Sequence, residues 1–294
     1  MEPRLNKTVL LSGAEYFDDG QAINPFMDSS LVVDAAQAVA EHTALKLALR
    51  SSGVTVLETP APPSLQDGVY TANWALVRGD KAVLASLPPS RQGEQPYAKA
   101  ALENLGKRVY EVPAGLKFSG QGDALPCGNY LFCGSGYRSD ALVQPFLAEI
   151  LGYKIIGLQT IPQTDAAGAP VTNPVSGWPD SYFYDLDLAL AVLKSPEAGQ
   201  KGLIAWCPEA FLSESREKLR TFTEVDKIEV SLTEAKEAFA CNLVSTGEAV
   251  VMSASAPELQ TAIEAHGLRT IPLSMPELAK GGGFIRCTTL TLDN

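Results

Sequence analysis

Apolar and polar positions alternate along the chain with the periods of strands and helices. After Asp28-Ser29-Ser30, which are good N-cap residues, positions 31, 35, 38, 42, 45 and 49 fall on one face of a helix. That helix is predicted to end near Ser51-Ser52-Gly53. The β-branched, alternating segment VTVLET predicts a strand, and the prolines at 60, 62 and 63 predict a loop after it.

A strand–helix pattern then recurs, each time around one small polar residue or thiol. Helical segments are predicted at 96–105, 141–152, 209–219 and 257–267. Five such units in a ring would point their polar residues at one centre. We therefore predict an α/β fold of about five ββαβ-type repeats around a polar central cavity, with residues 1–294 as a single domain. The polar residues that anchor the five units are Asn73, Asp123, Asp187, Asn242 and Cys287.

The two ends of the chain are expected to share one unit. The last apolar segment, TTLTLDN, has no helix after it, whereas TVLLSG near the start precedes the first helix. Pairing these two segments closes the ring and leaves no long exposed sheet edge.

Composition narrows the class of function. Hydrophobic residues make up 46% and charged residues 19%, enough to bury a large core. The net charge of −11 argues against nucleic acid and is compatible with a small cationic substrate. No apolar run spans a bilayer and no signal-peptide pattern opens the chain, so a cytoplasmic protein with no membrane partner is expected.

The five cysteines form no CxxC pair, and the chain has two histidines. This pattern predicts reduced thiols without structural zinc, and neither a metal nor a cofactor is implied. His42 is expected in the core and His266 at a helix end. Cys287 is the best candidate nucleophile, because three glycines at 281–283 would let backbone approach a ligand closely. The alternative is that Cys287 is a small buried hydrophobe.

Seven motifs resemble, in order and spacing, the guanidino-group modifying branch of the pentein superfamily. They are INPFM (23–27), VYTANWALV (69–77), RQGE (91–94), GQGDAL (120–125), GSGYRSD (134–140), YDLDLALAVL (184–193) and GGGFIRC (281–287). That branch includes arginine deiminases, dimethylarginine dimethylaminohydrolases, arginine dihydrolases and glycine amidinotransferases. The resemblance implies a pentein α/β propeller and a cysteine that attacks a guanidinium carbon.

Carried over position by position, the resemblance implies roles for particular residues. Cys287 is the nucleophile, and Arg91 holds the amino-acid carboxylate of the substrate through a bidentate pair. Asp67 would face a cationic substrate. The remaining substrate-binding candidates are Asn24, Asn73, Ser119 and Asp123.

Two positions depart from the family pattern. Relatives usually read F-E-G-x-G-D where this chain has Ser119, and Y-H-L-D where it has Asp185. Asp185 and Asp187 are two apart, so on a strand they would face the same side and their repulsion would raise one pKa. Asp185 then acts as a weak acid and base, or replaces the lost glutamate, or marks a lost reaction.

The leading hypothesis is a cysteine-dependent hydrolase or amidinotransferase acting on arginine or a related guanidino compound, with Cys287, Asp185 and Asp187 as catalytic residues. One alternative is a protein that binds a small amino acid derivative without turnover. Another is an enzyme for a non-guanidino electrophile. A catalytic Cys287 with a lowered pKa would be alkylated faster than the other four cysteines. A homo-oligomer is compatible with the sequence.

Overall fold

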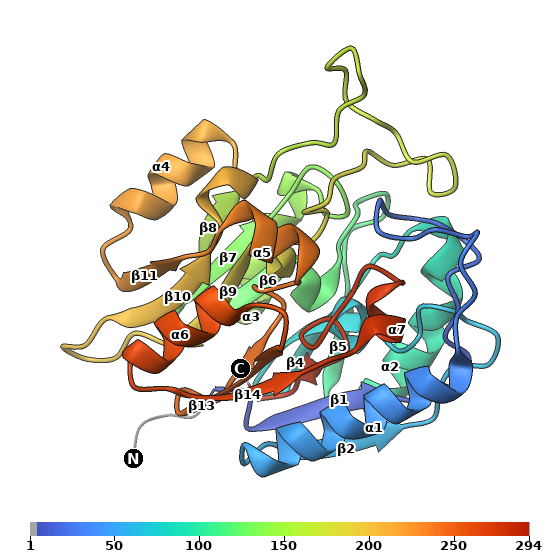
Figure 1. Ribbon diagram of the computed structural model, residues 1–294, viewed down its shortest axis with the longest axis horizontal. Helices are drawn as coiled ribbons and strands as arrows, with labels where there is room; N and C mark the ends of the chain where they lie inside the picture. The colour runs from blue at the N-terminus through green and yellow to red at the C-terminus, as the bar shows by residue number, and fades with distance from the viewer. Residues whose placement is uncertain (1–4, 294) are drawn as a thin grey trace.

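In the computed structural model, which describes residues 5–293, five three-stranded sheets are arranged around a common centre (Figure 1). The sheets are β15 (Leu290–Thr291), β1 (Thr8–Ser12) and β2 (Thr55–Thr59); β3 (Ala75–Arg78), β4 (Lys81–Leu84) and β5 (Arg108–Glu111); β6 (Ala124–Cys127), β7 (Tyr130–Gly134) and β8 (Lys154–Leu158); β9 (Leu190–Lys194), β10 (Gly202–Trp206) and β11 (Val225–Glu229); and β12 (Val244–Ser245), β13 (Ala249–Ser253) and β14 (Arg269–Leu273).

Every sheet has the same topology. An antiparallel pair, such as β3 and β4, is followed by a helix and then by a third strand parallel to the second. A parallel neighbour needs a crossover, and the helix supplies it. This arrangement confirms the predicted ββαβ-type repeats. The crossover helices are α1 (Ala35–Ser51), α2 (Gln95–Asn104), α3 (Gln144–Leu151), α4 (Ser213–Thr221) and α6 (Pro257–Ala265); α5 (Leu232–Glu237) and α7 (Pro276–Ala279) are short additions.

The middle strand of each sheet is covered on both faces. The sequences GLIAW of β10 and AVVMS of β13 are buried along their whole length. Such strands read as continuous apolar runs because helices cover one face and neighbouring sheets the other. Among residues 5–293, no helix is long and apolar enough to cross a membrane.

The ends of the chain meet as predicted. β15 pairs antiparallel with β1, with Val9 opposite Thr291 and Leu10 opposite Leu290. The Thr71 hydroxyl donates to the carbonyls of Leu10 and Thr288 at 2.9 and 3.0 Å, which ties the first full unit to this closing sheet. The ring is therefore sealed by hydrogen bonds between segments at opposite ends of the sequence.

The predicted start of the first helix is wrong. Asp28 caps a local turn, accepting from the Ser30 hydroxyl, and Leu31 is 52% exposed. The helix begins at Ala35, where the Asp34 carboxylate accepts from the Gln37 amide at 3.0 Å. The predicted helix at 209–219 also begins late, at Ser213, because Phe211 forms a bridge with Thr160 first.

Short 3₁₀ turns lead into the inner strands and aim the polar anchors at the axis. The turns Thr71–Trp74, Gly120–Gly122 and Leu186–Leu188 precede β3, β6 and β9. Asp185 and Asp187 therefore belong to a turn, not to a strand as the sequence suggested. Cys287 likewise lies in a turn just before β15.

Candidate active site

Cys287 lies at the centre of the ring with its thiol between two polar side chains. Its Sγ accepts from Asn242 Nδ2 at 3.2 Å and donates to Asp187 Oδ2 at 3.5 Å. The Cys287 amide donates to Asn242 Oδ1 at 3.1 Å. Asn242 thus grips both the backbone and the side chain of Cys287, which fixes the direction of the thiol.

The glycine-rich segment packs closely against Cys287 and Tyr70. A Cβ on Gly283 would lie 2.9 Å from Cys287 Cβ and 2.6 Å from Tyr70 Cε1. The carbonyls of Gly281 and Gly282 accept from Asn24 Nδ2 at 3.0 Å and from the Tyr184 hydroxyl at 2.6 Å. Any larger residue would displace the wall next to the thiol.

Asn24 contributes to the site through this segment. Its Nδ2 holds the Gly281 carbonyl, and its Oδ1 accepts from the Phe26 amide at 3.0 Å. Because both ends of the amide are engaged, the contact of Asn24 with the rest of the site is to the glycine-rich backbone.

Two carboxylates at the turn that precedes β9 act on the thiol: Asp187 by a hydrogen bond and Asp185 through its charge. Asp185 Oδ2 accepts from Asn73 Nδ2 at 2.7 Å, and Asp187 Oδ2 accepts from Cys287. The second oxygen of each carboxylate, Oδ1, is buried and has no hydrogen-bond partner among the described residues. Buried acceptors without partners are rare, and a pair of them beside a thiol is suited to a ligand that donates N–H groups.

The expected role of Arg91 does not fit its surroundings. Its guanidinium is closed on Glu94 by two hydrogen bonds of 2.7 and 2.8 Å, and its Nη1 donates to Asn73 Oδ1 at 2.9 Å. Arg91 Nη2 also donates to the carbonyls of Asp67 and Tyr70. With its fork occupied by Glu94, Arg91 orients Asn73 and has no second fork for a substrate carboxylate.

A relay of hydrogen bonds therefore runs from Glu94 through Arg91 and Asn73 to Asp185. Asn73 Nδ2 also donates to the Ser119 hydroxyl at 2.9 Å, so Ser119 belongs to the same network. Gly122 is part of this packing, because a Cβ there would lie 2.6 Å from Asp185 Oδ2 and 2.5 Å from Asn73 Nδ2. The smallest side chain is needed where the two segments meet.

Asp123 and Asp67 are buried near these groups. Asp123 Oδ1 accepts from the Leu186 amide at 3.0 Å, which orients the turn that carries Asp185 and Asp187. Asp67 Oδ2 accepts from Gln66 Nε2 at 3.3 Å and lies in the field of Arg91. Both candidates are at the site, and Asp123 acts through the backbone of the turn.

Burial dominates the electrostatics. It raises the pKa of Asp67 to about 6 and, with the neighbouring Asp185, that of Asp123 to about 8. The pKa of Asp187 also rises well above its ordinary value, through burial first and Asp185 second. Removing carboxylates from water disfavours their charged form, and like charges add to the effect.

The thiol differs from the sequence expectation. Burial, then Asp187 and Asp185, raise the pKa of Cys287 well above its ordinary value, so the resting site holds a neutral thiol. A lowered pKa would need a positive group beside the sulfur. The structure places Asn242 and Asp187 there instead, and neither stabilises a thiolate as a cation would.

Sequence reasoning did not single out Arg138 as a site residue. Its guanidinium stacks 3.9 Å above the Tyr184 ring and donates to the Ile23 carbonyl at 3.1 Å. Arg138 is buried, and Asp123 and Asp67 lie within its electrostatic reach. The signal available was its place in the GSGYRSD motif, whose glycines and serines let a long side chain turn inwards.

The two histidines lie in helix α1 and at the C-terminal end of helix α6, away from Cys287 in the chain. His42 is buried in α1 with a pKa lowered to about 4 by burial, and His266 caps α6. Within residues 5–293, no three of the His, Cys, Asp and Glu side chains are grouped so that they could hold a metal ion.

Comparisons with known proteins agree with this geometry. The bifunctional arginine dihydrolase/ornithine cyclodeaminase AgrE of Nostoc is 31% identical over 96% of this chain, which spans 37% of that protein. The chain thus covers little more than a third of such bifunctional relatives. The dimethylarginine dimethylaminohydrolase of Mycobacterium tuberculosis is 31% identical over 99% of this chain and 87% of its own length. No family model matches the chain.

Solved structures share the whole ring. The N-terminal domain of ArgZ, a cyanobacterial arginine dihydrolase captured with substrate as a cysteine-to-serine mutant, superposes with a TM-score of 0.83 at 27% identity and covers 98% of both chains. The five mixed three-stranded sheets described here, the buried central thiol and the similarity over nearly the full chain have one explanation. The chain belongs to the guanidino-group modifying branch of the pentein superfamily.

Proposed function

We propose that this protein is a cysteine-dependent hydrolase of a guanidino compound, with arginine or a close derivative as substrate. The observation that carries the proposal is the pair of unpartnered Oδ1 atoms of Asp185 and Asp187 beside the Cys287 thiol. A guanidinium presents planar N–H donors on both sides of its carbon. Two buried carboxylates and one thiol are the complement of that group.

In this proposal the substrate is held at both ends. Its guanidinium donates to the Oδ1 atoms of Asp185 and Asp187, which brings the central carbon over Cys287 Sγ. Arg138 binds the carboxylate of the substrate, because it is buried, carries one protein hydrogen bond and points into the same region. The role expected of Arg91 passes to Arg138, since Glu94 occupies the Arg91 fork.

The charge of the substrate activates the thiol. A cation bound next to Cys287 favours the thiolate, which the buried acids alone oppose. The bound cation likewise favours the ionised form of Asp187, whose own proton leaves to solvent. Asp187 then accepts the Cys287 proton, and the thiolate forms a C–S bond with the guanidinium carbon. One C–N bond then breaks, the leaving amine takes up a proton, and water later breaks the C–S bond to release a ureido product.

Asp185 is proposed as the acid and base at the position where relatives carry a histidine. Asn73 fixes one of its oxygens at 2.7 Å and leaves the other towards the substrate. The neighbouring carboxyls of Asp187 and Asp123 have raised pKa values, so groups that can exchange protons surround Asp185.

The proposal is tested with a substrate panel. Purified protein is incubated with arginine, agmatine, methylated arginines and guanidinoacetate; ureido products and ammonia are assayed, and intact mass is measured. We expect product from at least one compound, abolished in Cys287→Ala and retained in Cys207→Ala, a buried cysteine at the start of a different turn.

Three other results would each change the conclusion. Neither product nor adduct from any compound, with the protein folded and Cys287 still alkylated, would overturn the hydrolase proposal in favour of another electrophile. A guanidino compound that raises the melting temperature without turnover would instead support a protein that binds such a ligand. An amine acceptor that replaces water in product formation would identify an amidinotransferase.

A further inference from the structure

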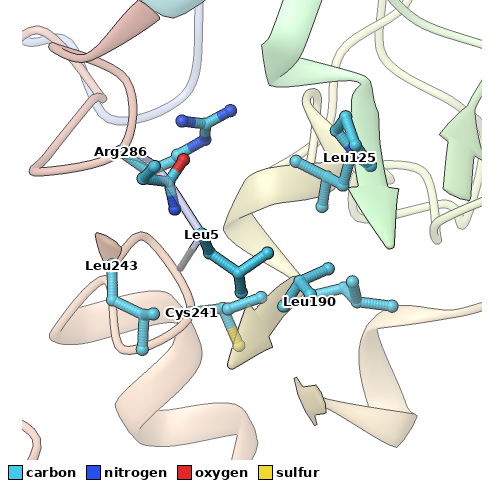
Figure 2. Close-up of a pocket in the computed structure, with 10 residues that line it drawn as sticks. Leu5, Leu125, Leu190, Cys241, Leu243 and Arg286 are labelled. Atoms are coloured by element: carbon cyan, nitrogen blue, oxygen red, sulfur yellow. The ribbon is translucent and has the colours of Figure 1, made fainter. Parts of the chain in front are cut away.

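A second cavity lies near Arg286, the residue next to Cys287 in the chain. It has a volume of about 40 Å³ and is lined by the inner strands β6 and β9, by the segment before β12 and by Leu5 (Figure 2). Figure 2 shows Arg286 on one side of this cavity, with Leu125 and Leu190 on the other. Because one water needs roughly 10–15 Å³ on this measure, the space suits a group of about three heavy atoms.

Arg286 is the only charged residue that lines this cavity among the described residues, and it is 7% exposed. Its Nη1 donates to Thr291 Oγ1 at 2.9 Å and its Nη2 to Gln121 Oε1 at 2.8 Å. These acceptors are neutral. No carboxylate of residues 5–293 forms an ion pair with Arg286, in contrast to Arg91, whose fork is closed on Glu94.

One edge of the Arg286 guanidinium is unused. Nη1 also donates to the Thr289 carbonyl at 3.4 Å, so both Nη1 hydrogens and one Nη2 hydrogen are used. Nε has no acceptor within residues 5–293, and Nη2 has one hydrogen left. Nε and Nη2 share one edge of a guanidinium, and such an edge binds planar oxyanions through two hydrogen bonds.

The charge of Arg286 also lacks compensation. Asp187 is the carboxylate that acts on it most strongly, but Asp187 is hydrogen-bonded to Cys287 and its pKa is raised well above the ordinary value. Buried charges in proteins are normally paired, since an unpaired one costs several kcal/mol of desolvation.

We propose that this cavity binds a small planar oxyanion of the size of formate or bicarbonate on the free edge of Arg286. The anion forms two hydrogen bonds with Nε and Nη2, and the apolar side chains of Leu125 and Leu190 cover its other side. The site is distinct from the Cys287 site, because the Arg286 side chain bonds Gln121 and Thr291 whereas the thiol contacts Asn242 and Asp187.

The test measures formate binding to the full chain. Carbon-13 formate is titrated at constant ionic strength, and line broadening of its NMR signal reports the dissociation constant. Arg286→Gln is expected to weaken binding at least about tenfold, because it removes a charge-assisted hydrogen-bonded pair. Ala191→Leu keeps Arg286 and fills the cavity from β9, so it is expected to weaken binding to a similar degree.

Two control variants locate the site. Arg138→Gln removes the other buried arginine available to a carboxylate and is expected to leave the Arg286-dependent binding unchanged. Arg108→Gln changes an exposed arginine paired with Asp80 and is expected to have no effect. Loss of formate binding in Arg138→Gln alone, or retention of wild-type affinity in both Arg286→Gln and Ala191→Leu, would overturn the proposal.

Discussion

At the scale of single residues, the site is defined by what each buried polar atom contacts. Asn242 holds Cys287, Asn73 holds Asp185, and the free oxygens of Asp185 and Asp187 remain for a ligand. Of the groups named here, those without a protein partner are the ones that a substrate would pair in the proposed mechanism. The chemistry therefore depends on a few short contacts, not on exposed charge.

The raised pKa of Cys287 predicts slow alkylation of the ligand-free protein. Because the thiolate is the reactive form, the rate with iodoacetamide should increase about tenfold per pH unit and still be increasing above pH 9. Peptide mass spectrometry of Cys287 between pH 6 and 10 measures this profile. A plateau below pH 8 would contradict the burial-driven shift.

The buried ion pair of Arg91 with Glu94 predicts a large effect on stability. Glu94→Gln leaves the Arg91 charge buried without its partner, and the free energy of unfolding should fall by about 3–5 kcal/mol. Urea denaturation measures the change. The matched control is Glu111→Gln, which breaks an exposed pair with Lys99 and should cost no more than about 0.5 kcal/mol. Equal losses in the two variants would show that burial does not matter here.

At the scale of elements, the recurring device is a short turn that enters an inner strand. The turns Gly120–Gly122 and Leu186–Leu188 are joined by Asp123, whose carboxylate accepts from the Leu186 amide. The position of Asp185 and Asp187 thus depends on a neighbouring repeat. A turn of this kind tolerates little added volume where two repeats touch.

Gly122→Ala is expected to damage the site more than the fold. Its Cβ would lie within 2.6 Å of both Asp185 Oδ2 and Asn73 Nδ2, so Asp185 must move. A displacement of this order at a catalytic group lowers kcat/KM by about 100-fold. Gly20→Ala, whose Cβ meets nothing closer than 3.4 Å, serves as the control. Full activity of Gly122→Ala in the substrate panel would remove Asp185 from the proposed mechanism.

At the scale of the whole molecule, the ring brings several buried acids together. Asp67, Asp123, Asp185 and Asp187 come from three different units and share one interior. Each acid that is protonated in the folded state and ionised in the unfolded state makes stability depend on pH. The closed ring therefore couples the chemistry of the site to the stability of the fold.

Asp123 sets the direction of that dependence. Its pKa is raised from 3.8 to about 8, so between these values the folded state holds a proton that the unfolded state has lost. Its contribution to stability is complete below about pH 4 and is lost as the pH rises towards 8, at up to about 1.4 kcal/mol per pH unit.

Urea denaturation between pH 5 and pH 8 measures this slope. Asp123→Asn keeps an acceptor for the Leu186 amide and cannot ionise, so its stability should decline less with pH than that of the wild type. Parallel curves for the two proteins would show that Asp123 is ionised in the folded state.

The sequence by itself determined the repeat, the ring closure and the identity of the nucleophile candidate. Apolar periodicity follows from local geometry, and the polar anchors Asn73, Asp123, Asp187, Asn242 and Cys287 recur once per unit. The five sheets confirmed the repeat, and the pairing of β1 with β15 confirmed the ring closure. Periodicity could not show that Asp34, and not the Asp28 region, caps the first helix, because both segments offer capping residues.

Only the tertiary structure decided how the polar residues pair. Arg91 pairs with Glu94 from the same turn, Arg138 stacks on Tyr184, and Arg286 donates to Gln121 from another unit. Each of these pairings depends on how the side chains pack in the folded chain. The direction of the Cys287 pKa was decided in the same way, because desolvation and neighbouring charges act through space. Sequence spacing specifies which side chains approach the axis, and packing specifies which of them are left for a ligand.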